Sequence, residues 1–387
     1  MTSPIPLEEA WARLLALVDP LPVEHVAAEQ AHDRYLAEPL VAARTQPAAD
    51  LSAMDGYALA GEGPWTVMGE SRCGAPFAAV LGPAKAARIS TGAVVPEGAD
   101  RVLIQENAKR EGDQLSGPWP DLGAHIRRQG IDFRQGDVLL PTGSRLGAPQ
   151  IALALAAGAD ALAVPRTPRV AVLDCGDELV DGSTPATNGA MLAAIMAGLP
   201  CEVRRIGPVP DDRTALAEAL GQCEDCDLVV TSGGASVGDH DLVRPALEAW
   251  GAEIAFWRVA IRPGKPLLVA RRGAALVLGL PGNPVSAYVT GFLFALPALR
   301  RMLGAGDPLP RGEPIRCTAD LPPGGERGEF LRAIRRPDGV EPILRRDSSL
   351  LAQLARADAL IWRPAHCSGA KAGTDVPVYR LENGAIA

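Results

Sequence analysis

The first segment whose residue types could do chemistry is residues 231–241, a loop of glycine, hydroxyl and acidic residues that directly follows a short apolar run. Its glycines would let backbone N–H groups approach a phosphate closely, with Ser232 and Ser236 as additional donors. If a helix follows from residue 242, the positive end of its dipole would favour the same anion. The loop therefore predicts a phosphate site, in which Gly233, Gly234 and Gly238 let the backbone come close to the phosphate.

A second pair of segments lies farther along the chain. In Arg262-Pro263-Gly264-Lys265, two cations flank a turn and can be directed together at one anion. In Pro281-Gly282-Asn283-Pro284, Asn283 suits a helix N-cap and Pro284 the first helical position. A structural role explains these two residues by itself, so a role in binding depends on the neighbouring cations.

Carboxylates accompany the glycine loop at both of its ends. Asp227 precedes it and Asp241 closes it. Carboxylates that converge on a phosphate usually hold Mg²⁺, since this ion takes oxygen ligands and offsets the repulsion between like charges. We therefore expect Asp227 and Asp241 to face one phosphate across a shared Mg²⁺, with further candidate acids at Asp55, Asp177 and Glu178.

Two other patterns are weaker candidates. Cys223 and Cys226 have the spacing of a zinc or redox pair, but no second Cys or His pair with ligand spacing follows them. Cys175 and His240 lie in predicted ligand loops without a partner base or nucleophile. We interpret these residues as neighbours of a site and not as its catalysts.

Length and composition limit the class of protein that carries these segments. A chain of 387 residues exceeds what one core usually serves, which predicts two to four domains. No apolar run of membrane-spanning length and no secretory signal is present, so we expect a soluble, cytoplasmic protein with reduced cysteines. A net charge of −8 argues against nucleic acid and anionic lipid as partners.

The elements that must position the candidate residues follow from hydrophobic patterning. Residues 7–28 have helical spacing, and residues 43–139 carry short β-branched runs among Gly and Pro, which predicts a β-rich domain. A boundary is expected at residues 165–168. From there strand and helix patterns alternate to about residue 305, which predicts a mostly parallel, helix-covered sheet, and short alternating runs beyond 306 predict a small β domain. Ligands of such sheets bind beyond the carboxyl ends of the strands.

Several motifs in one order resemble the MoeA family, to which the E domain of gephyrin is related. The resemblance is strong over about residues 7–304 and weaker beyond. It rests on Ser52-Ala53-Met54-Asp55-Gly56-Tyr57-Ala58, Ser90-Thr91-Gly92-Ala93, Pro96-Glu97-Gly98-Ala99-Asp100, Arg127-Arg128-Gln129-Gly130-Ile131-Asp132, Gly176-Asp177-Glu178-Leu179, residues 231–241 and residues 280–286.

The resemblance implies an elongated, multidomain chain of class α/β plus β. An N-terminal linker domain would comprise residues 1–43 and 140–166, and a β-rich domain would be inserted between them at residues 44–139. A three-layer, MogA-like α/β domain would span residues 167–305 and bind molybdopterin, and a β-barrel-like domain would span residues 306–387. Similar proteins are homodimers with the active cleft between the α/β domain of one subunit and the inserted domain of the other.

The same resemblance implies a molybdopterin molybdenumtransferase. It would insert molybdenum from molybdate into adenylyl-molybdopterin with Mg²⁺ and release AMP. Molybdopterin adenylyltransferase and apo-molybdoenzymes are the further partners it suggests. Implied catalytic residues are Asp55, Thr91, Glu178, Asp227, Asp241 and Lys265, with Asp227 and Asp241 on the metal. Implied substrate-binding residues are Arg127, Asp132, Ser232, Gly233, Gly234, Ser236, Gly238, Arg262, Pro281, Gly282, Asn283 and Pro284.

Three positions depart from the family pattern. Arg262 stands where lysine is usual, Ile131 where glutamate is usual, and Asp174-Cys175 where Ser-Thr is common.

Two other functions stay open. The related adenylyltransferase shares the fold and the Thr-Ser-Gly-Gly loop but normally lacks the N-terminal and inserted domains, so residues 53–57 and 127–132 favour metal insertion. A protein-binding scaffold on the same fold is the other alternative, against which the intact set of acids and cations argues.

Overall fold

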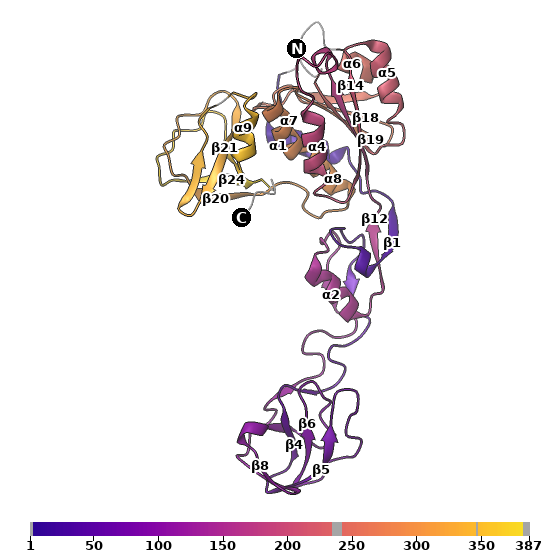
Figure 1. Cartoon of the computed structure of the whole chain (residues 1–387), viewed down its shortest axis with the longest axis vertical. Helices are drawn as coiled ribbons and strands as arrows, with labels where there is room; N and C mark the ends of the chain where they lie inside the picture. The colour runs from indigo at the N-terminus through magenta and orange to yellow at the C-terminus, as the bar shows by residue number, and fades with distance from the viewer. Residues whose placement is uncertain (1–2, 234–241, 346, 382–387) are drawn as a thin grey trace.

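The chain is elongated in the computed structural model, which describes residues 3–233, 242–345 and 347–381. A six-stranded α/β unit and a β unit from the end of the chain lie together at one end of the molecule (Figure 1). A short unit built around α2 (Ala148–Ala157) follows, and a second six-stranded β unit lies at the far end. The multidomain architecture expected from the sequence is confirmed.

The α/β unit is built on one sheet with the strand order β14-β13-β15-β19-β18-β16. The first four strands run parallel to one another. β18 runs antiparallel to its neighbour β19, and the edge strand β16 runs antiparallel to β18. Nearly continuous apolar sequence in the central strands fits a sheet that is buried on both faces. The strands are β13 (Arg169–Cys175), β14 (Glu202–Val209), β15 (Leu228–Ser232), β16 (Glu253–Trp257), β18 (Leu268–Arg272) and β19 (Ala275–Leu280).

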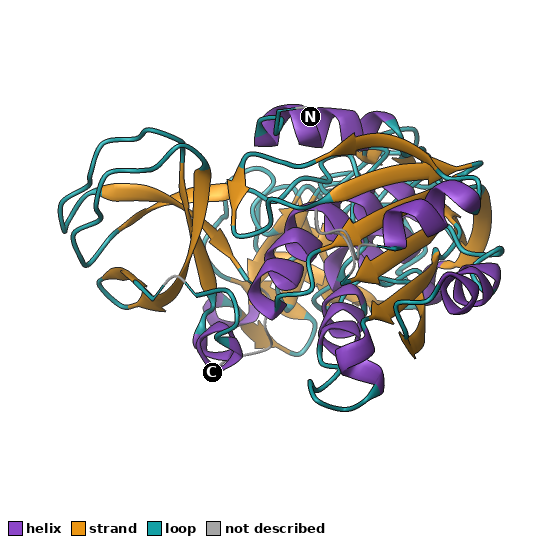
Figure 2. Ribbon diagram, turned by 90° about the horizontal axis from the view of Figure 1, so that it is seen from above, coloured by secondary structure: helices purple, strands orange, loops and turns teal. Residues whose placement is uncertain are grey.

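Helices cover both faces of this sheet, as the view from above shows (Figure 2). Buried residues of α1 (Leu7–Ala16), α4 (Asn188–Met196), α7 (Pro284–Thr290) and α8 (Leu296–Met302) share one core with the sheet. Residues of α5 (Arg213–Gly221) and α6 (Val243–Ala249) form the core on the other face. A π-helical segment, Gly291–Ala295, joins α7 to α8. Among the described residues, no helix is long and apolar enough to cross a membrane.

The N-terminal helix is shorter than its sequence pattern suggests. We expected helix over residues 7–28, but α1 ends at Ala16, and Pro20 and Pro22 follow. Residues Val23–Ala27 form β1, which pairs antiparallel with β12 (Ala161–Pro165). This two-stranded ribbon connects the α/β unit to the linker unit, whose other elements are η1 (Ala28–Gln30), β2 (Leu40–Val41) and β11 (Val138–Leu140).

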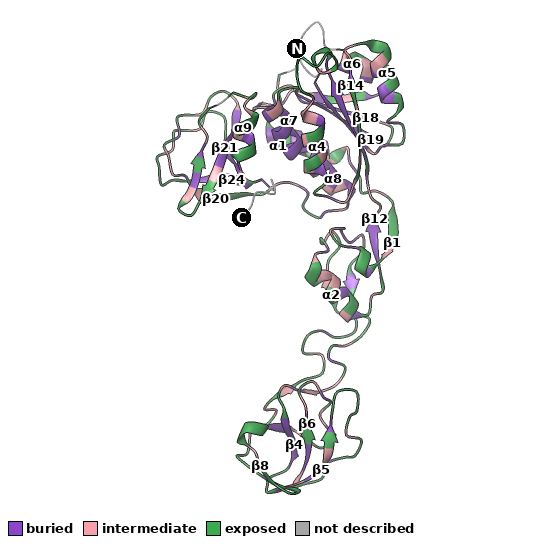
Figure 3. Ribbon diagram, in the orientation of Figure 1, coloured by how far each residue is buried: buried purple, intermediate pink, exposed green. Residues whose placement is uncertain are grey.

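The inserted unit has its own hydrophobic cores, apart from those of the α/β unit (Figure 3). Its sheet has the order β7-β4-β6-β5-β9-β8, and β3 pairs with β10 beside it. The strands are β3 (Leu51–Ser52), β4 (Gly56–Ala60), β5 (Trp65–Ser71), β6 (Lys85–Ile89), β7 (Arg101–Ile104), β8 (Lys109–Glu111), β9 (Gln114–Ser116) and β10 (Ile126–Arg127).

The C-terminal unit is joined to the α/β unit by a strand from the latter. β17 (Ile261–Arg262) pairs parallel with β21 (Gly328–Arg336), so Arg262 lies in register with Glu329. The unit also contains α9 (Leu351–Arg356). The remaining strands are β20 (Gly312–Arg316), β22 (Gly339–Pro342), β23 (Ala359–Arg363) and β24 (Asp375–Arg380).

Separate cores predict separate local stability. Leu59 is fully buried in the core of the inserted unit, and Leu59→Ala should cost about 2 to 5 kcal/mol there through lost burial and a residual cavity. Hydrogen exchange followed by mass spectrometry should show faster exchange in β4, β6 and β7, with unchanged protection in β13, β15 and β19. An equal rise in exchange in both sheets would show that the two units unfold together.

Candidate active site

A cleft of about 630 Å³ opens at the carboxyl ends of β13, β15 and β19. This is the edge at which ligands of parallel sheets bind. Its lining includes five residues that the sequence placed in the site through the glycine loop and the helix start, and Glu178 from α3 (Asp177–Val180). Those five residues are Ser232, Gly233, Gly282, Asn283 and Pro284.

Close backbone packing shapes the floor of the cleft. Gly233 has φ +94°, and a Cβ there would lie 2.2 Å from the carbonyl oxygen of Cys175. A Cβ on Gly282 would lie 3.4 Å from the Cα of Gly233. Glycine at 233 is therefore required by the approach of β13 and by its left-handed conformation. The result is a closely packed backbone floor between the three strand ends, in which the N–H of Gly233 donates to the carbonyl oxygen of Leu280 at 3.3 Å.

Asn188, the first residue of α4, ties two of these strand ends together. Its side-chain Nδ2 donates to Ser232 Oγ at 2.9 Å and to the carbonyl oxygen of Gly282 at 2.6 Å. Its Oδ1 is buried and has no hydrogen-bond partner among the described residues. The sequence analysis missed Asn188, because a polar residue at a helix start is equally well explained as a cap.

The C-terminal unit supplies one wall of the cleft through Ser349 and Leu351. The loop that carries them is fixed by Arg332, a buried residue of β21 whose guanidinium donates to the carbonyl oxygens of Arg345, Asp347 and Leu350. Ser349 also donates from its N–H and its hydroxyl to Asp347 Oδ1. No local sequence pattern indicated these residues, since their role depends on contact between two units.

The cation turn lies on the other side of the start of α7. Arg262 lines a small hollow with Val285 and Ser348, and its guanidinium is 3.9 Å from Glu329 Oε1. The N–H of Val285 donates to the carbonyl oxygen of Ser348 at 3.1 Å, which separates this hollow from the main cleft. Lys265 is exposed on the same turn. The two predicted cations therefore flank the cleft and do not line it.

Two residues of the inserted unit are in direct contact. Asp55 Oδ1 accepts from the N–H of Thr91 at 2.6 Å and from its hydroxyl at 3.0 Å, and these bonds lower the pKa of the Asp55 carboxyl. Arg127 lies nearby on β10, which pairs with β3 just before Asp55. Asp132 is exposed farther along the same loop region. Asp55 and Thr91 face solvent in the inserted unit, which lies far from the α/β unit of its own chain (Figure 1).

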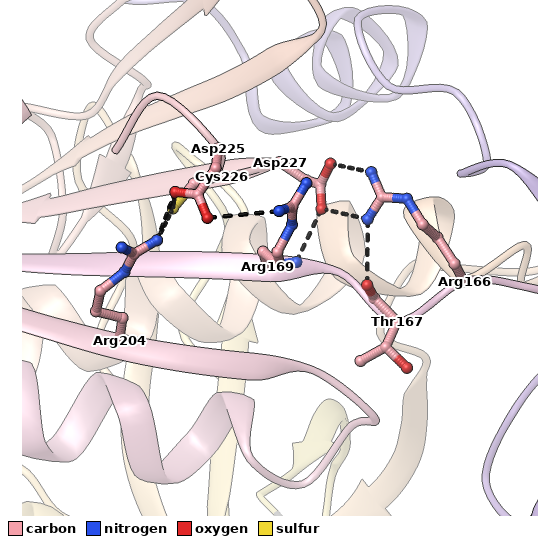
Figure 4. A network of polar contacts seen from close by, with 7 residues as sticks. All are labelled: Arg166, Thr167, Arg169, Arg204, Asp225, Cys226 and Asp227. Atoms are coloured by element: carbon pink, nitrogen blue, oxygen red, sulfur yellow. Dashed lines mark hydrogen bonds and ion pairs between the residues drawn. The ribbon is translucent and has the colours of Figure 1, made fainter. Parts of the chain in front are cut away.

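The position of Asp227 requires a correction. It precedes β15, whereas Ser232 ends that strand, so the two residues lie about 16 Å apart along it. Both carboxylate oxygens of Asp227 accept from Arg166, at 2.6 and 2.8 Å, and one also accepts from the N–H of Arg169 (Figure 4). The prediction that Asp227 meets a phosphate-bound metal at the cleft is therefore wrong, because sequence proximity to the loop placed it at the opposite end of the strand.

Four other predicted residues lie outside the described part of the chain, namely Gly234, Ser236, Gly238 and Asp241. Among the described residues no group of three or more His, Cys, Asp or Glu side chains could hold a metal. Pro281 is buried directly after β19, beside the lining residues Gly282 and Asn283.

Comparisons with known proteins agree with this architecture. Models of the MoeA N-terminal region (domain I and II), a probable molybdopterin binding domain and the MoeA C-terminal region (domain IV) match residues 5–158, 171–301 and 314–381. The molybdopterin molybdenumtransferase of Nostoc is 35% identical over 385 residues, covering 91% of this chain and 87% of that protein. The chain belongs to the MoeA family.

Two further MoeA relatives support the assignment. The molybdopterin molybdenumtransferase of Haemophilus influenzae is 35% identical over 314 residues, which cover 77% of this chain and 78% of that protein. The crystal structure of the MoeA molybdopterin biosynthesis protein of Pyrococcus horikoshii superposes with a TM-score of 0.85 at 26% identity, covering 98% of this chain and all of that one. The expected family and fold are confirmed.

Within this MoeA-family chain, Asp174 is the departure with a clear structural consequence. It lines the cleft, it is buried, and its Oδ1 accepts from the N–H of Gly189 in α4 at 2.7 Å. Arg205 lies 3.7 Å from its other oxygen. Burial raises the pKa of Asp174 above its ordinary value of 3.8, and the contacts with Gly189 and Arg205 offset this only in part.

This raised pKa predicts a pH-dependent cost. An acid whose pKa is higher in the folded chain destabilises the fold as it ionises, so its stabilising effect is lost as the pH rises from about 3.8 through the raised value. Asparagine keeps an acceptor for the Gly189 N–H but does not ionise. In urea unfolding, Asp174→Asn should therefore gain stability relative to the parent chain as the pH rises from about 4 to about 8.

The matched control is Asp181→Asn. Hydrogen bonds from Ser183 lower the pKa of this exposed carboxyl, so its contribution is retained at high pH and lost as the pH falls. The control should show no growing advantage at high pH. A constant loss of stability in Asp174→Asn at every pH would contradict the assignment of a burial cost to Asp174.

Proposed function

We propose that the chain is a molybdopterin molybdenumtransferase, a transferase of molybdenum cofactor biosynthesis. It inserts molybdenum from molybdate into adenylyl-molybdopterin and releases AMP. The observation that carries the proposal is the cleft at the ends of β13, β15 and β19, whose lining includes the polar side chains of Ser232, Asn188 and Glu178 and has room for an adenylylated pterin. Family membership supports the same reaction.

Residue types around the cleft fit a positional and electrostatic mechanism. Joining an oxyanion to a dithiolene while a phosphoanhydride is cleaved requires charge stabilisation at both anions and alignment of the reacting groups. Arg262 and Lys265, beside the start of α7, would bind molybdate or the released anion. Arg262 offers a planar pair of donors where the family commonly has lysine, and Glu329 Oε1 lies 3.9 Å from its Nε.

We propose that Mg²⁺ takes part and that it binds largely through phosphate oxygens of the substrate. Mg²⁺ commonly uses one or two carboxylates together with substrate phosphates and water. Glu178 is the exposed carboxylate on the described lining of the cleft and fits this donor set. When bound, the ion would offset charge on the phosphoanhydride, with Glu178 as its ligand from the protein.

We also propose that the active form is a homodimer in which each cleft receives residues from both chains. Asp55 directly precedes β4 and Thr91 follows β6, so both lie in the inserted unit, at the end of the molecule opposite the α/β unit (Figure 1). Arg127 lies on β10 beside that sheet, and Asp132 is next to Phe133, which packs against Ala157 of α2 in the linker unit. Asp55 and Thr91 cannot reach the cleft of their own chain without a large rearrangement. The same proposal includes the predicted domain limits. They are residues 1–43 with 140–166 for the linker domain, 44–139 for the inserted domain, 167–305 for the α/β domain and 306–387 for the C-terminal domain.

The alternatives make different use of this chain. An adenylyltransferase needs the α/β cleft alone and gives no role to the contact between Asp55 and Thr91. A protein-binding scaffold needs neither an open cleft nor its cations. Metal insertion gives both features a role.

Molybdate-dependent release of AMP tests the proposal directly. Purified protein is incubated with adenylyl-molybdopterin and Mg²⁺, with and without molybdate, and AMP is quantified. We expect AMP only with molybdate and a strong decrease when Mg²⁺ is omitted. In a parallel incubation with ATP and molybdopterin, formation of adenylyl-molybdopterin and pyrophosphate would instead support the adenylyltransferase. Absence of molybdate-dependent AMP in the first incubation would overturn metal insertion.

A mixed dimer tests the shared cleft. Asp55→Ala removes a residue of the inserted unit and Glu178→Ala a residue of the α/β unit, so each homodimer should be inactive. Random pairing of equal amounts should restore about one quarter of parental activity, since about half of the dimers are mixed and each has one intact cleft. Mixtures that stay as inactive as the single variants would contradict a cleft shared between chains.

A further inference from the structure

The joint between the linker unit and the α/β unit contains an ion pair that the reaction does not use directly. The chain leaves β12 at Pro165 and enters β13 at Arg169, with Arg166, Thr167 and Pro168 between them. Arg166 is the first residue past the ribbon, and Asp227 belongs to the central sheet. Their contact joins the ribbon to the central sheet, alongside Tyr35 of the linker unit, which is buried in the core of the α/β unit.

The geometry of this contact fixes the joint in more than one direction (Figure 4). Arg166 Nη1 and Nη2 donate to the two oxygens of Asp227, and Nη1 also donates to the carbonyl oxygen of Thr167 at 3.2 Å. The N–H of Arg169 donates to Asp227 Oδ2 at 2.8 Å. One carboxylate thus holds both the start of the joint and its end.

Asp227 is itself held firmly within the sheet. Its N–H donates to the carbonyl oxygen of Arg169 at 2.8 Å, and its carbonyl oxygen accepts from Leu276 at 2.9 Å. The side chain is 13% exposed, against 32% for Arg166. Burial opposes ionisation of Asp227, but the bonds from Arg166 and Arg169 outweigh it and hold the pKa of the carboxyl below its ordinary value. The pair is therefore charged at neutral pH, and loss of either partner leaves a half-buried charge uncompensated.

A second contact joins the linker unit to the end of the α/β unit. Gly306 N–H donates to the carbonyl oxygen of Gly143 at 3.3 Å, and a Cβ on Gly143 would lie 2.7 Å from Gly306 N. The N–H of Arg166 also donates to the carbonyl oxygen of Pro22 in the neighbouring strand connection at 2.8 Å. Separate contacts around a narrow ribbon set a direction, whereas one contact would allow rotation about it.

We infer that Arg166 and Asp227 are positioning residues that set the direction in which the linker and inserted units leave the α/β unit. This inference rests on the proposed function, because the inserted unit must carry Asp55, Thr91 and Arg127 to the cleft of a partner chain. A long arm converts a small rotation at its base into a large displacement at its end. Misplacement of a reacting group by about 1 Å can reduce a rate about a hundredfold.

Spin labels across the joint measure this direction without substrate. Labels are attached at Ala152→Cys on α2 and Glu218→Cys on α5, both exposed helical positions, in a Cys73→Ser background that removes the exposed native thiol. Labelled chains are assembled with excess unlabelled chain, so that the distance within one chain dominates. The distance distribution by double electron–electron resonance is then compared among variants.

Arg166→Met and Asp227→Asn should broaden or shift this distribution and lower kcat for molybdate-dependent AMP release about 10- to 100-fold. KM for molybdate should change little, since the cation turn is untouched. Arg166→Lys keeps the charge and should restore part of both properties. The control is Asp225→Asn, which breaks the exposed contacts of Asp225 with Arg204 and Arg169 inside the α/β unit and should leave distance and kcat unchanged.

Two results would overturn the inference. Parental distance distributions in Arg166→Met and Asp227→Asn would show that the pair does not set the direction, even if activity fell through lost stability. A changed distribution with parental kcat would show that the direction does not matter for the reaction. Because the distance needs no substrate, a parent chain that releases no AMP would contradict the proposed function while the distance still decides whether the pair fixes the joint.

Discussion

Arg166 and Asp227 meet where the chain passes from a thin two-stranded ribbon into the central sheet. Everything beyond that ribbon is held at its base by few contacts, so the position of the inserted unit depends on them. In the α/β unit, by contrast, large shared cores fix each strand end relative to the next. The molecule therefore combines a rigid cleft with an arm whose placement depends on the contacts at its base, this half-buried ion pair among them.

The cleft itself depends on backbone packing more than on any one side chain. Gly233 allows β15 to approach Cys175, and Asn188 bridges Ser232 to Gly282. Such a floor presents polar groups in fixed positions, as expected of a site that works by alignment and charge stabilisation. The wall formed by the C-terminal unit, held by the buried Arg332, gives that unit a direct part in shaping the cleft.

Sequence patterns predicted the units and the cleft because strand alternation and glycine-rich strand ends are local signals. They missed β14, an exposed edge strand with charged residues and weak alternation, and they overextended α1 past Pro20. Contacts between units left no local signal, so Arg332 and the true role of Asp227 could not be read from sequence. Asp227 shows the limit clearly, since neighbours in sequence can occupy opposite ends of a strand.

Hydrogen exchange upon addition of AMP and molybdate tests the whole account of the cleft in one measurement. The account predicts protection in two places at once, at the strand ends around Gly233 and Gly282 and at Asp55 and Thr91 in the inserted unit. Protection should vanish from the inserted unit alone when the protein is diluted to monomers. Protection confined to the α/β unit in the dimer would contradict a cleft built from both chains.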